Sequence, residues 1–412
     1  MRPWLRDGSI LGAAQIAASG IALCTLLLVA RGLGEGRFGT FAAVLGLAQA
    51  ASLVIGMGTE TFLLRELSRA DVGEPERAEL LQSVLALVAR ATPVAAAVGL
   101  LAALAVTRRV ELAAGWAVLL VYVGGLGLCS AAEARLRAAR RVAAVATSLV
   151  TEKTVALGSV LLVVAVAGAG VLGVALALLP GMLVRLVVDC VALHRRGWLP
   201  AGLALRVPAR SIVRRSAPIA LNGLTTVGIP RLDTTLVAAA TAGGAGYFAL
   251  GGSLVGAALV VPSTLSQAMY PHLARGGLRG RRAVALYAVS GLAGAALLVA
   301  ATPSILALAF PAAEGEATGA VRRMLAAIPI AFVANGLLPL VYARRLEHGT
   351  PVPLAAATLL GSVAVVAGAA LGGVEGAALG FLLRPLLILA VLAAVLGAPR
   401  RHAARREAAS AT

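Results

Sequence analysis

Charged residues are scarce in this chain. Only 13% of its 412 residues are charged, whereas 60% are hydrophobic. Soluble domains typically carry about a quarter charged residues, so a soluble domain of this length is excluded. Aromatic residues are also few, at 4%. The mean hydropathy of +0.93 predicts an all-α protein that crosses a membrane many times.

Residues that carry redox, metal or nucleotide chemistry are few and scattered. The three cysteines (Cys24, Cys129 and Cys190) lie in apolar segments without metal-ligand spacing, as is typical of packing residues. The four histidines form no zinc motif, and no phosphate-binding Walker A sequence occurs. We therefore expect no metal, no cofactor, no catalytic residues and no direct use of ATP. The short outer loops also disfavour a membrane enzyme of glycan assembly, which needs an extracytoplasmic loop or domain to hold catalytic groups.

Acidic residues are outnumbered two to one. The chain has 18 acidic and 36 basic residues, for a net charge of +18, and Lys153 is its only lysine. The arginines punctuate apolar spans and do not line one face, so the charge does not indicate nucleic-acid binding.

Long apolar runs make up most of the chain, and twelve of them are long enough to span a bilayer. The first run is followed by Arg31 without an evident cleavage site, so we interpret it as a membrane helix and not a signal peptide. The predicted spans are 10–30, 40–64, 81–106, 112–132, 143–166, 171–193, 216–240, 246–270, 284–310, 324–343, 352–371 and 374–396.

The arginines sort between alternate loops. With the N-terminus in the cytoplasm, the inner segments hold 25 basic residues and the outer segments hold 6, leaving five within spans. Cytoplasmic loops of membrane proteins carry such an excess. This predicts an inner (cytoplasmic) membrane protein with both termini in the cytoplasm.

The two halves of the chain resemble each other. Residues 33–42 align with 240–249 at an offset of 207, which matches Gly39 with Gly246 and Phe41 with Phe248. Six spans per half give both halves the same orientation, the parallel pseudo-two-fold repeat seen in transporters. We expect an N-lobe (1–205) and a C-lobe (206–412) of six helices each. The basic stretch 194–215 joins them, either lying on the inner leaflet or forming a solvated loop.

Five cationic side chains fall inside predicted spans: Arg90, Lys153, Arg185, Arg231 and Arg384. A cation at the bilayer centre costs roughly 2.5–3.5 kcal/mol on insertion scales. Chains keep such groups where they face a wet interior and bind a ligand. The sign of these charges predicts an anionic ligand.

Four of the five are predicted to bind the substrate. Arg90, Arg231 and Arg384 each lie within three residues of a proline, and proline bends membrane helices where they border a cavity. Lys153 lies near mid-depth and follows Glu152, but neighbours in sequence face about 100° apart on a helix, so we expect their pairing to be imperfect.

The acidic residues suggest other roles. Asp189 follows Arg185 by four residues, a spacing that predicts a structural ion pair. Asp233 and Glu60 are the candidates for ion coupling. The sequence also allows Arg231 and Asp233 to serve only in ion pairs between helices.

Several segments resemble the polysaccharide biosynthesis or oligosaccharide flippase family. That family includes O-antigen flippases and belongs to the multidrug/oligosaccharidyl-lipid/polysaccharide exporter superfamily. The resemblance lies in the ARGLG-x-x-x-FG element at 30–39, Leu-Arg-Glu at 64–66, Arg-Leu-Asp at 231–233 and the run 246–271. The last four spans match mainly by hydropathy.

The resemblance implies two six-helix lobes around a central cavity. It implies movement of an isoprenoid pyrophosphate-linked oligosaccharide from the inner to the outer leaflet by alternating access. Membrane lipids and glycan-assembly enzymes are the other expected partners. Nothing in the sequence demands more than a monomer. Arginine suits the anionic pyrophosphate. H⁺ coupling, Na⁺ coupling and an uncoupled cycle all remain open. A multidrug exporter of the same superfamily and a major-facilitator transporter are the alternative functions.

Overall fold

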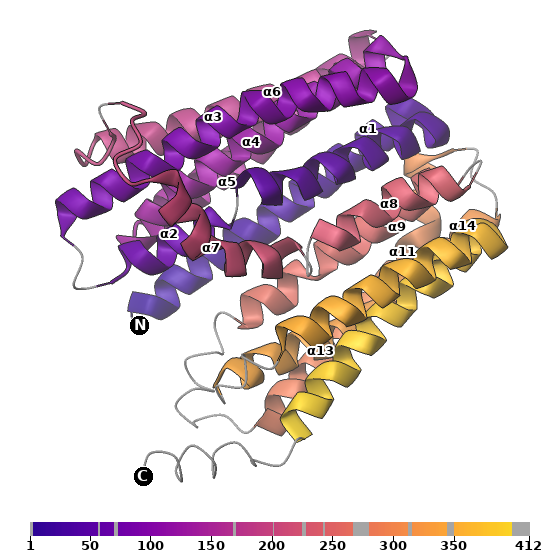
Figure 1. Cartoon of the computed structure of the whole chain (residues 1–412). Helices are drawn as coiled ribbons and strands as arrows, with labels where there is room; N and C mark the ends of the chain where they lie inside the picture. The colour runs from indigo at the N-terminus through magenta and orange to yellow at the C-terminus, as the bar shows by residue number, and fades with distance from the viewer. Residues whose placement is uncertain are drawn as a thin grey trace.

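The computed structural model is a bundle of helices (Figure 1). It describes residues 3–56, 58–69, 73–167, 170–200, 202–224, 228–241, 244–266, 280–311, 315–343 and 350–397, and these ranges contain no strand. Their helices are α1 (Pro3–Gly56), α2 (Thr59–Leu67), α3 (Glu74–Thr107), α4 (Val110–Ala138), α5 (Val142–Ala167), α6 (Val171–His194), α7 (Ala209–Gly223), α8 (Ile229–Ala240), α9 (Ala245–Ala258), α11 (Gly280–Ala309), α12 (Gly315–Leu325), α13 (Ala327–Ala343) and α14 (Pro351–Gly397).

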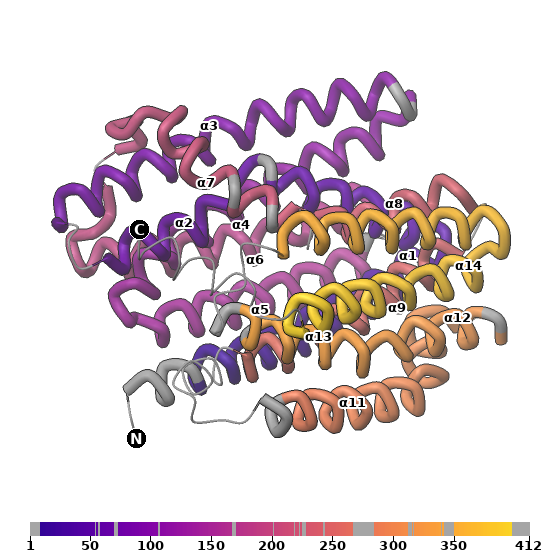
Figure 2. The backbone as a smooth tube through the Cα atoms, turned by 60° about the horizontal axis from the view of Figure 1, so that its bottom comes forward, coloured from indigo at the N-terminus to yellow at the C-terminus, as the bar shows by residue number. Residues whose placement is uncertain are grey.

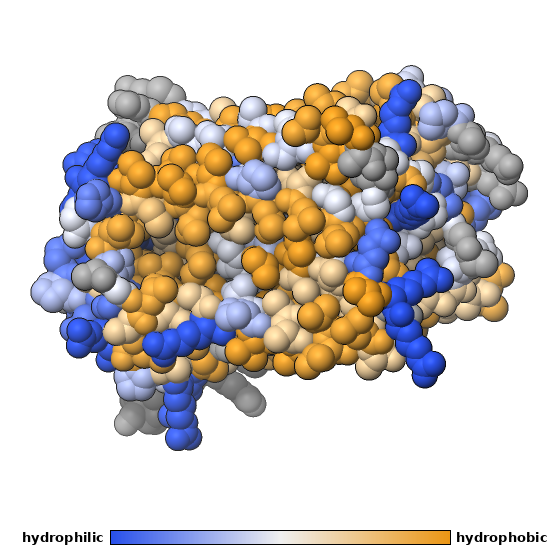
Figure 3. All heavy atoms as spheres, turned by 90° about the horizontal axis from the view of Figure 1, so that it is seen from above, coloured by the Kyte–Doolittle hydropathy of each residue, from blue (hydrophilic) through white to orange (hydrophobic). Residues whose placement is uncertain are grey.

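One face of the bundle is apolar across its middle (Figure 3). Figure 3 shows hydrophobic residues across the centre of one face and hydrophilic residues at both ends. Within the described ranges, nine helices are long and apolar enough to cross a membrane. Helices suit these segments because a spanning helix satisfies its own backbone hydrogen bonds where no water is available. The prediction of an all-helical, multi-pass membrane protein is confirmed.

The helix α14 is a tight hairpin. Its 47 residues are interrupted at Gly372 and Gly373, and Gly373 adopts φ 59°, ψ −144°. Residues on either side pack in antiparallel order: Gly368 lies against Gly376, and Ala364 against Gly380. The chain therefore reverses where the sequence analysis separates the spans 352–371 and 374–396.

The helix α1 also changes direction at a glycine. Gly34 has φ 73° and ψ 170° inside its 54 residues. Gly32, before this point, packs against Val164 of α5, whereas Gly46, after it, packs against the backbone of Arg231 in α8. The spans predicted at 10–30 and 40–64 thus correspond to different parts of one interrupted helix.

Three predicted spans have wrong boundaries. Within span 40–64, α1 ends at Gly56 and α2 begins at Thr59, because glycines at 56 and 58 disfavour a continuous helix. Span 216–240 consists of α7 and α8, with Pro230 in the first turn of α8. Span 324–343 begins too late, since α12 precedes α13 with one residue between them.

The helices pack in two groups with α1 between them. The helices α3 to α6 lie on one side of α1 and α8 to α14 on the other (Figures 1 and 2). The second part of α1 meets the start of α9: a Cβ added to Gly39 would lie 2.9 Å from the backbone nitrogen of Gly246. Glu35 also accepts a hydrogen bond from the Gly244 amide at 2.9 Å. The two segments matched by the sequence repeat therefore touch each other.

The hairpin in α14 gives a stability prediction. A Cβ at Gly376 would clash with the carbonyl oxygen of Gly368, whereas one at Gly372 would meet nothing within 4 Å. We expect Gly376→Ala to lower the free energy of unfolding by about 1–3 kcal/mol, the usual cost of overpacking. Denaturant unfolding of the detergent-solubilised protein measures this. Gly372→Ala is the matched control, and equal stability of the two variants would contradict the hairpin.

Candidate functional site

A cavity of about 290 Å³, lined by both polar and apolar side chains, lies between α1 and the helices on both sides of it. It is bordered by α1, α4, α5 and the helical turns that follow α9. The contact of Gly12 with Thr264 lies beyond one end of it, and the contact of Gly39 with Gly246 lies toward the other. The lining residues are Gln15, Ala18, Ser19, Ala22, Arg137, Leu149, Lys153, Val260 and Ser263.

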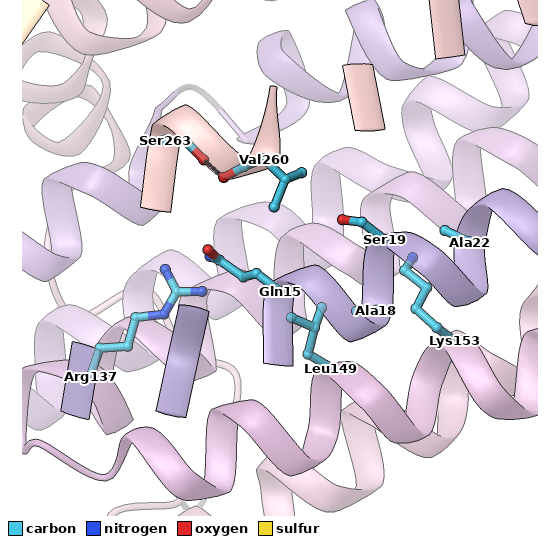
Figure 4. Close-up of a pocket in the computed structure, with 9 residues that line it drawn as sticks. All are labelled: Gln15, Ala18, Ser19, Ala22, Arg137, Leu149, Lys153, Val260 and Ser263. Carbon is cyan, nitrogen blue, oxygen red and sulfur yellow. Dashed lines mark hydrogen bonds between the residues drawn. The ribbon is translucent and has the colours of Figure 1, made fainter. Parts of the chain in front are cut away.

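Two cations point into this cavity. In Figure 4 the guanidinium of Arg137 lies by the amide of Gln15, and the ammonium of Lys153 lies by Ser19. The described lining contains no carboxylate. The cavity therefore offers positive charge and neutral hydrogen-bonding groups, a combination that suits an anion.

Each cavity cation is held by a buried glutamate behind it. Lys153 Nζ lies 2.6 Å from Glu152 Oε1, so the pairing expected to be imperfect is close. Arg137 Nη2 lies 2.7 Å from Glu133 Oε2. Both glutamates are fully buried, and each therefore fixes the position of a cation at the cavity wall.

Arg185 joins the two glutamates. Its Nη2 lies 2.7 Å from Glu133 Oε1 and its Nη1 lies 2.5 Å from Glu152 Oε2. Tyr122 and Ser148 add hydroxyl contacts at 3.3 Å to Glu152 and Glu133 respectively. Together with Arg137 and Lys153, this buried cation supplies the counter-charge that the two carboxylates need in the low-dielectric interior.

The predicted ion pair of Arg185 with Asp189 is not present among the described contacts. Arg185 reaches across to α4 and α5, where two carboxylates offer it more hydrogen bonds than one residue on its own helix. Asp189 is fully buried, and neither of its carboxylate oxygens has a hydrogen-bond partner in the described part of the chain.

Glu60 and Asp233, the predicted ion-coupling residues, lie in different settings. Glu60 is partly exposed and accepts a hydrogen bond from Arg137 at 2.9 Å. Asp233 is buried in α8 and pairs with Arg384 of α14. Ser362 donates to Asp233 at 2.8 Å and accepts from Arg384 at 2.9 Å.

Arg90 and Arg231 lie on exposed surfaces. Arg90 shares the exposed stripe of α3 with Val94 and Val98 and donates to the carbonyl of Leu203 at 3.2 Å. The side chain of Arg231 is exposed. Thus Lys153, alone of the four predicted substrate-binding cations, lines the cavity, and this structure does not bring the four together.

Sequence reasoning missed two central residues. The fourth predicted span ends at residue 132, which places Arg137 among the inner-loop arginines and leaves Glu133 without a role. The helix α4 in fact continues to Ala138. The four-residue spacing of Glu133 and Arg137 is the ion-pair signal that could have found them.

The pair between Asp233 and Arg384 gives a second stability prediction. Asp233→Asn leaves a buried guanidinium without a counter-charge, so we expect a loss of about 3–5 kcal/mol in unfolding free energy. Asp233→Leu combined with Arg384→Met removes both charges and should recover most of that loss. Thermal and denaturant unfolding in detergent measure both. An Asp233→Asn variant that is as stable as the original protein would contradict the buried pair.

Comparison with known proteins identifies relatives of this chain. The sequence profile of the family described as "Polysaccharide biosynthesis protein" matches residues 4–276. No curated protein matches the sequence.

Solved membrane transporters share the fold. A multidrug resistance MATE family transporter of the MOP superfamily, in an inward-facing conformation, is similar with a TM-score of 0.65 at 17% identity, covering 96% of each chain. The lipid II flippase MurJ, in an inward closed conformation, has a TM-score of 0.71 at 11% identity, covering 94% of this chain and 87% of that one. The eukaryotic MATE transporter AtDTX14 has a TM-score of 0.62 at 15% identity.

These neighbours are transporters and a flippase, and the chain is a membrane protein of the same fold. Because the family profile covers more than half of its residues, the chain belongs to the polysaccharide biosynthesis protein family.

Proposed function

We propose that this protein moves a lipid-linked oligosaccharide from the inner to the outer leaflet, holding the anionic pyrophosphate in the cavity between Arg137 and Lys153. The observation that carries this proposal is the sign of the cavity lining: two cations, three neutral polar side chains and no carboxylate among its described residues. Arginine and lysine bind phosphate oxygens through charge-assisted hydrogen bonds. Arg90, Arg231 and Arg384 stay predictions as further contacts during transport.

The position of the cavity also supports transport. Its walls come from α1, α4 and α5 in the first half of the chain and from residues 260 and 263 in the second half. A site formed by both halves changes its access when the halves rock against each other, as in other transporters with repeats. The contact between Gly39 and Gly246, which the repeat matches with each other, fits an approximate two-fold axis through this end of the molecule.

We propose the predicted topology together with this function: twelve spans in an N-lobe (1–205) and a C-lobe (206–412), with both termini in the cytoplasm of an inner-membrane protein. Twelve spans require α1 and α14 to form two spans each, and both helices are interrupted. They also require α7 and α8 to form one span together. Figure 1 supports the common side of the termini, since α1 begins and α14 ends at the same end of the bundle.

Export of cationic drugs is the second candidate, because several structural neighbours are MATE transporters. A cavity for organic cations is expected to carry acidic and aromatic side chains. The described lining carries neither, so the flippase is the better proposal.

A complementation experiment tests the proposal. In a strain without this gene, we expect lipid-linked oligosaccharide to accumulate on the inner leaflet and surface glycan to be lost. Lys153→Gln and Arg137→Gln should each lower the restored export by about 10-fold or more, since a charged hydrogen bond contributes about 1.5–3 kcal/mol. Glu152 keeps Arg185 as a partner in the first variant, so the protein should still fold.

Arg141→Gln is the matched control. Arg141 lies four residues beyond Arg137 and is exposed, but it does not line the cavity. Its loss should leave export unchanged. Full export by both cavity variants would contradict the proposed binding site, and a deletion strain without accumulated lipid-linked oligosaccharide would contradict the substrate.

A further inference from the structure

Asp189 is a buried acid that the proposed transport site does not use. It lies on α6 with no exposed surface, and both carboxylate oxygens lack a hydrogen-bond partner within the described ranges. An ionised carboxylate without a partner is expensive to bury, and the neutral carboxylic acid is not. Its surroundings therefore favour a bound proton.

The charges around Asp189 lead to the same conclusion. Connected ion pairs link three cations (Arg137, Lys153 and Arg185) with three carboxylates (Glu60, Glu133 and Glu152). This cluster is neutral without Asp189. An ionised Asp189 would give it one uncompensated negative charge, which a proton removes.

The ionisable groups near Asp189 come from the helices packed against α6. The helix α4 supplies Glu133, Arg137 and Cys129, and α6 itself supplies Arg185 and Cys190. From α5, Glu152 pairs with Arg185. The first half of α1 has no charged residue between positions 8 and 30. Ser148 of α5 also lies near Asp189, but its hydrogen bonds go to Glu133 and Val145. Arg185 is therefore the cation best placed to respond when Asp189 ionises, since it lies four residues away on the same helix.

We propose that Asp189 is a proton-binding site that sets the affinity of the cavity for an anion. With Asp189 protonated, Arg185 holds Glu133 and Glu152, as in this structure, and both carboxylates are shared between Arg185 and a cavity cation. With Asp189 ionised, Arg185 is drawn toward it, so Glu133 and Glu152 bind Arg137 and Lys153 more tightly. An anion in the cavity must then compete with these carboxylates.

This inference rests on the proposed anion-binding cavity and adds a coupling to it. By linkage, an anion that binds the protonated form better must also increase proton binding at Asp189. The proton-linked residue would then be Asp189, and not Glu60 or Asp233, the candidates named from the sequence.

Binding measurements with a defined probe test the coupling. The full-length protein in phosphatidylcholine nanodiscs is titrated with farnesyl pyrophosphate across the pH range, and each variant is compared with the same probe. From low to high pH, we expect the original protein to lose on the order of 10-fold more affinity for the probe than Asp189→Asn loses. An effect of this size is expected for one unit charge within such a cluster. Asp189→Asn should keep the low-pH affinity of the original protein throughout.

Glu60→Gln is the matched control, since Glu60 belongs to the same ion-pair cluster but is partly exposed. It should retain the pH dependence. The inference is overturned if Asp189→Asn retains the pH dependence of the original protein, or if Glu60→Gln abolishes it.

Infrared spectroscopy separates this inference from the proposed function. A protonated carboxyl group gives a carbonyl band that Asp189→Asn should remove, whether or not a ligand binds. If the original protein shows this band but binds no pyrophosphate at any pH, the proposed cavity fails, and with it the coupling, while the proton site itself stands. If no pH produces a band that depends on Asp189, the inference is wrong.

Discussion

Arg185 makes the interaction on which the polar interior of this protein depends. Three helices, α4, α5 and α6, pack against one another, and two of them carry fully buried glutamates. The guanidinium of Arg185 lies between these glutamates and pairs with both. Without it, Glu133 and Glu152 would each keep only one cation, Arg137 or Lys153, and those cations would be less available to a ligand. A buried arginine outside the cavity thus controls the charge of the cavity wall.

The cost of placing charge inside a membrane protein explains why cations line the cavity. A bilayer-spanning protein can place charge in its interior only where a counter-charge or water meets it. Here Glu133 and Glu152 are buried behind the wall and the cations face the cavity, so an anion can approach the cations without meeting a carboxylate in the described lining. In the other half of the molecule, Asp233 and Arg384 satisfy each other between α8 and α14, and this pairing leaves Arg384 away from the cavity.

The sequence predicted much of the fold because hydropathy is a strong signal in membrane proteins. It located the reversals near Gly34 and Gly373, since apolar runs much longer than the bilayer must turn, and its family assignment is confirmed. The ends of helices were predicted less well, because a helix can continue beyond the apolar residues that mark its span. Such a continuation concealed Glu133 and Arg137 just beyond the predicted end of the fourth span. Side-chain partners were also missed: Arg185 was paired with the nearest acid in sequence, but the acids that bind it come from other helices.

We propose that Arg137 and Lys153 hold an anionic head group between the two halves of the chain. A cryo-electron microscopy structure of the full-length protein with a short-chain polyprenyl pyrophosphate bound tests it most directly. We expect pyrophosphate density between the guanidinium of Arg137 and the ammonium of Lys153, within reach of Gln15 and Ser19. Pyrophosphate density elsewhere in the molecule, with both cations still bound only to their glutamates, would contradict it.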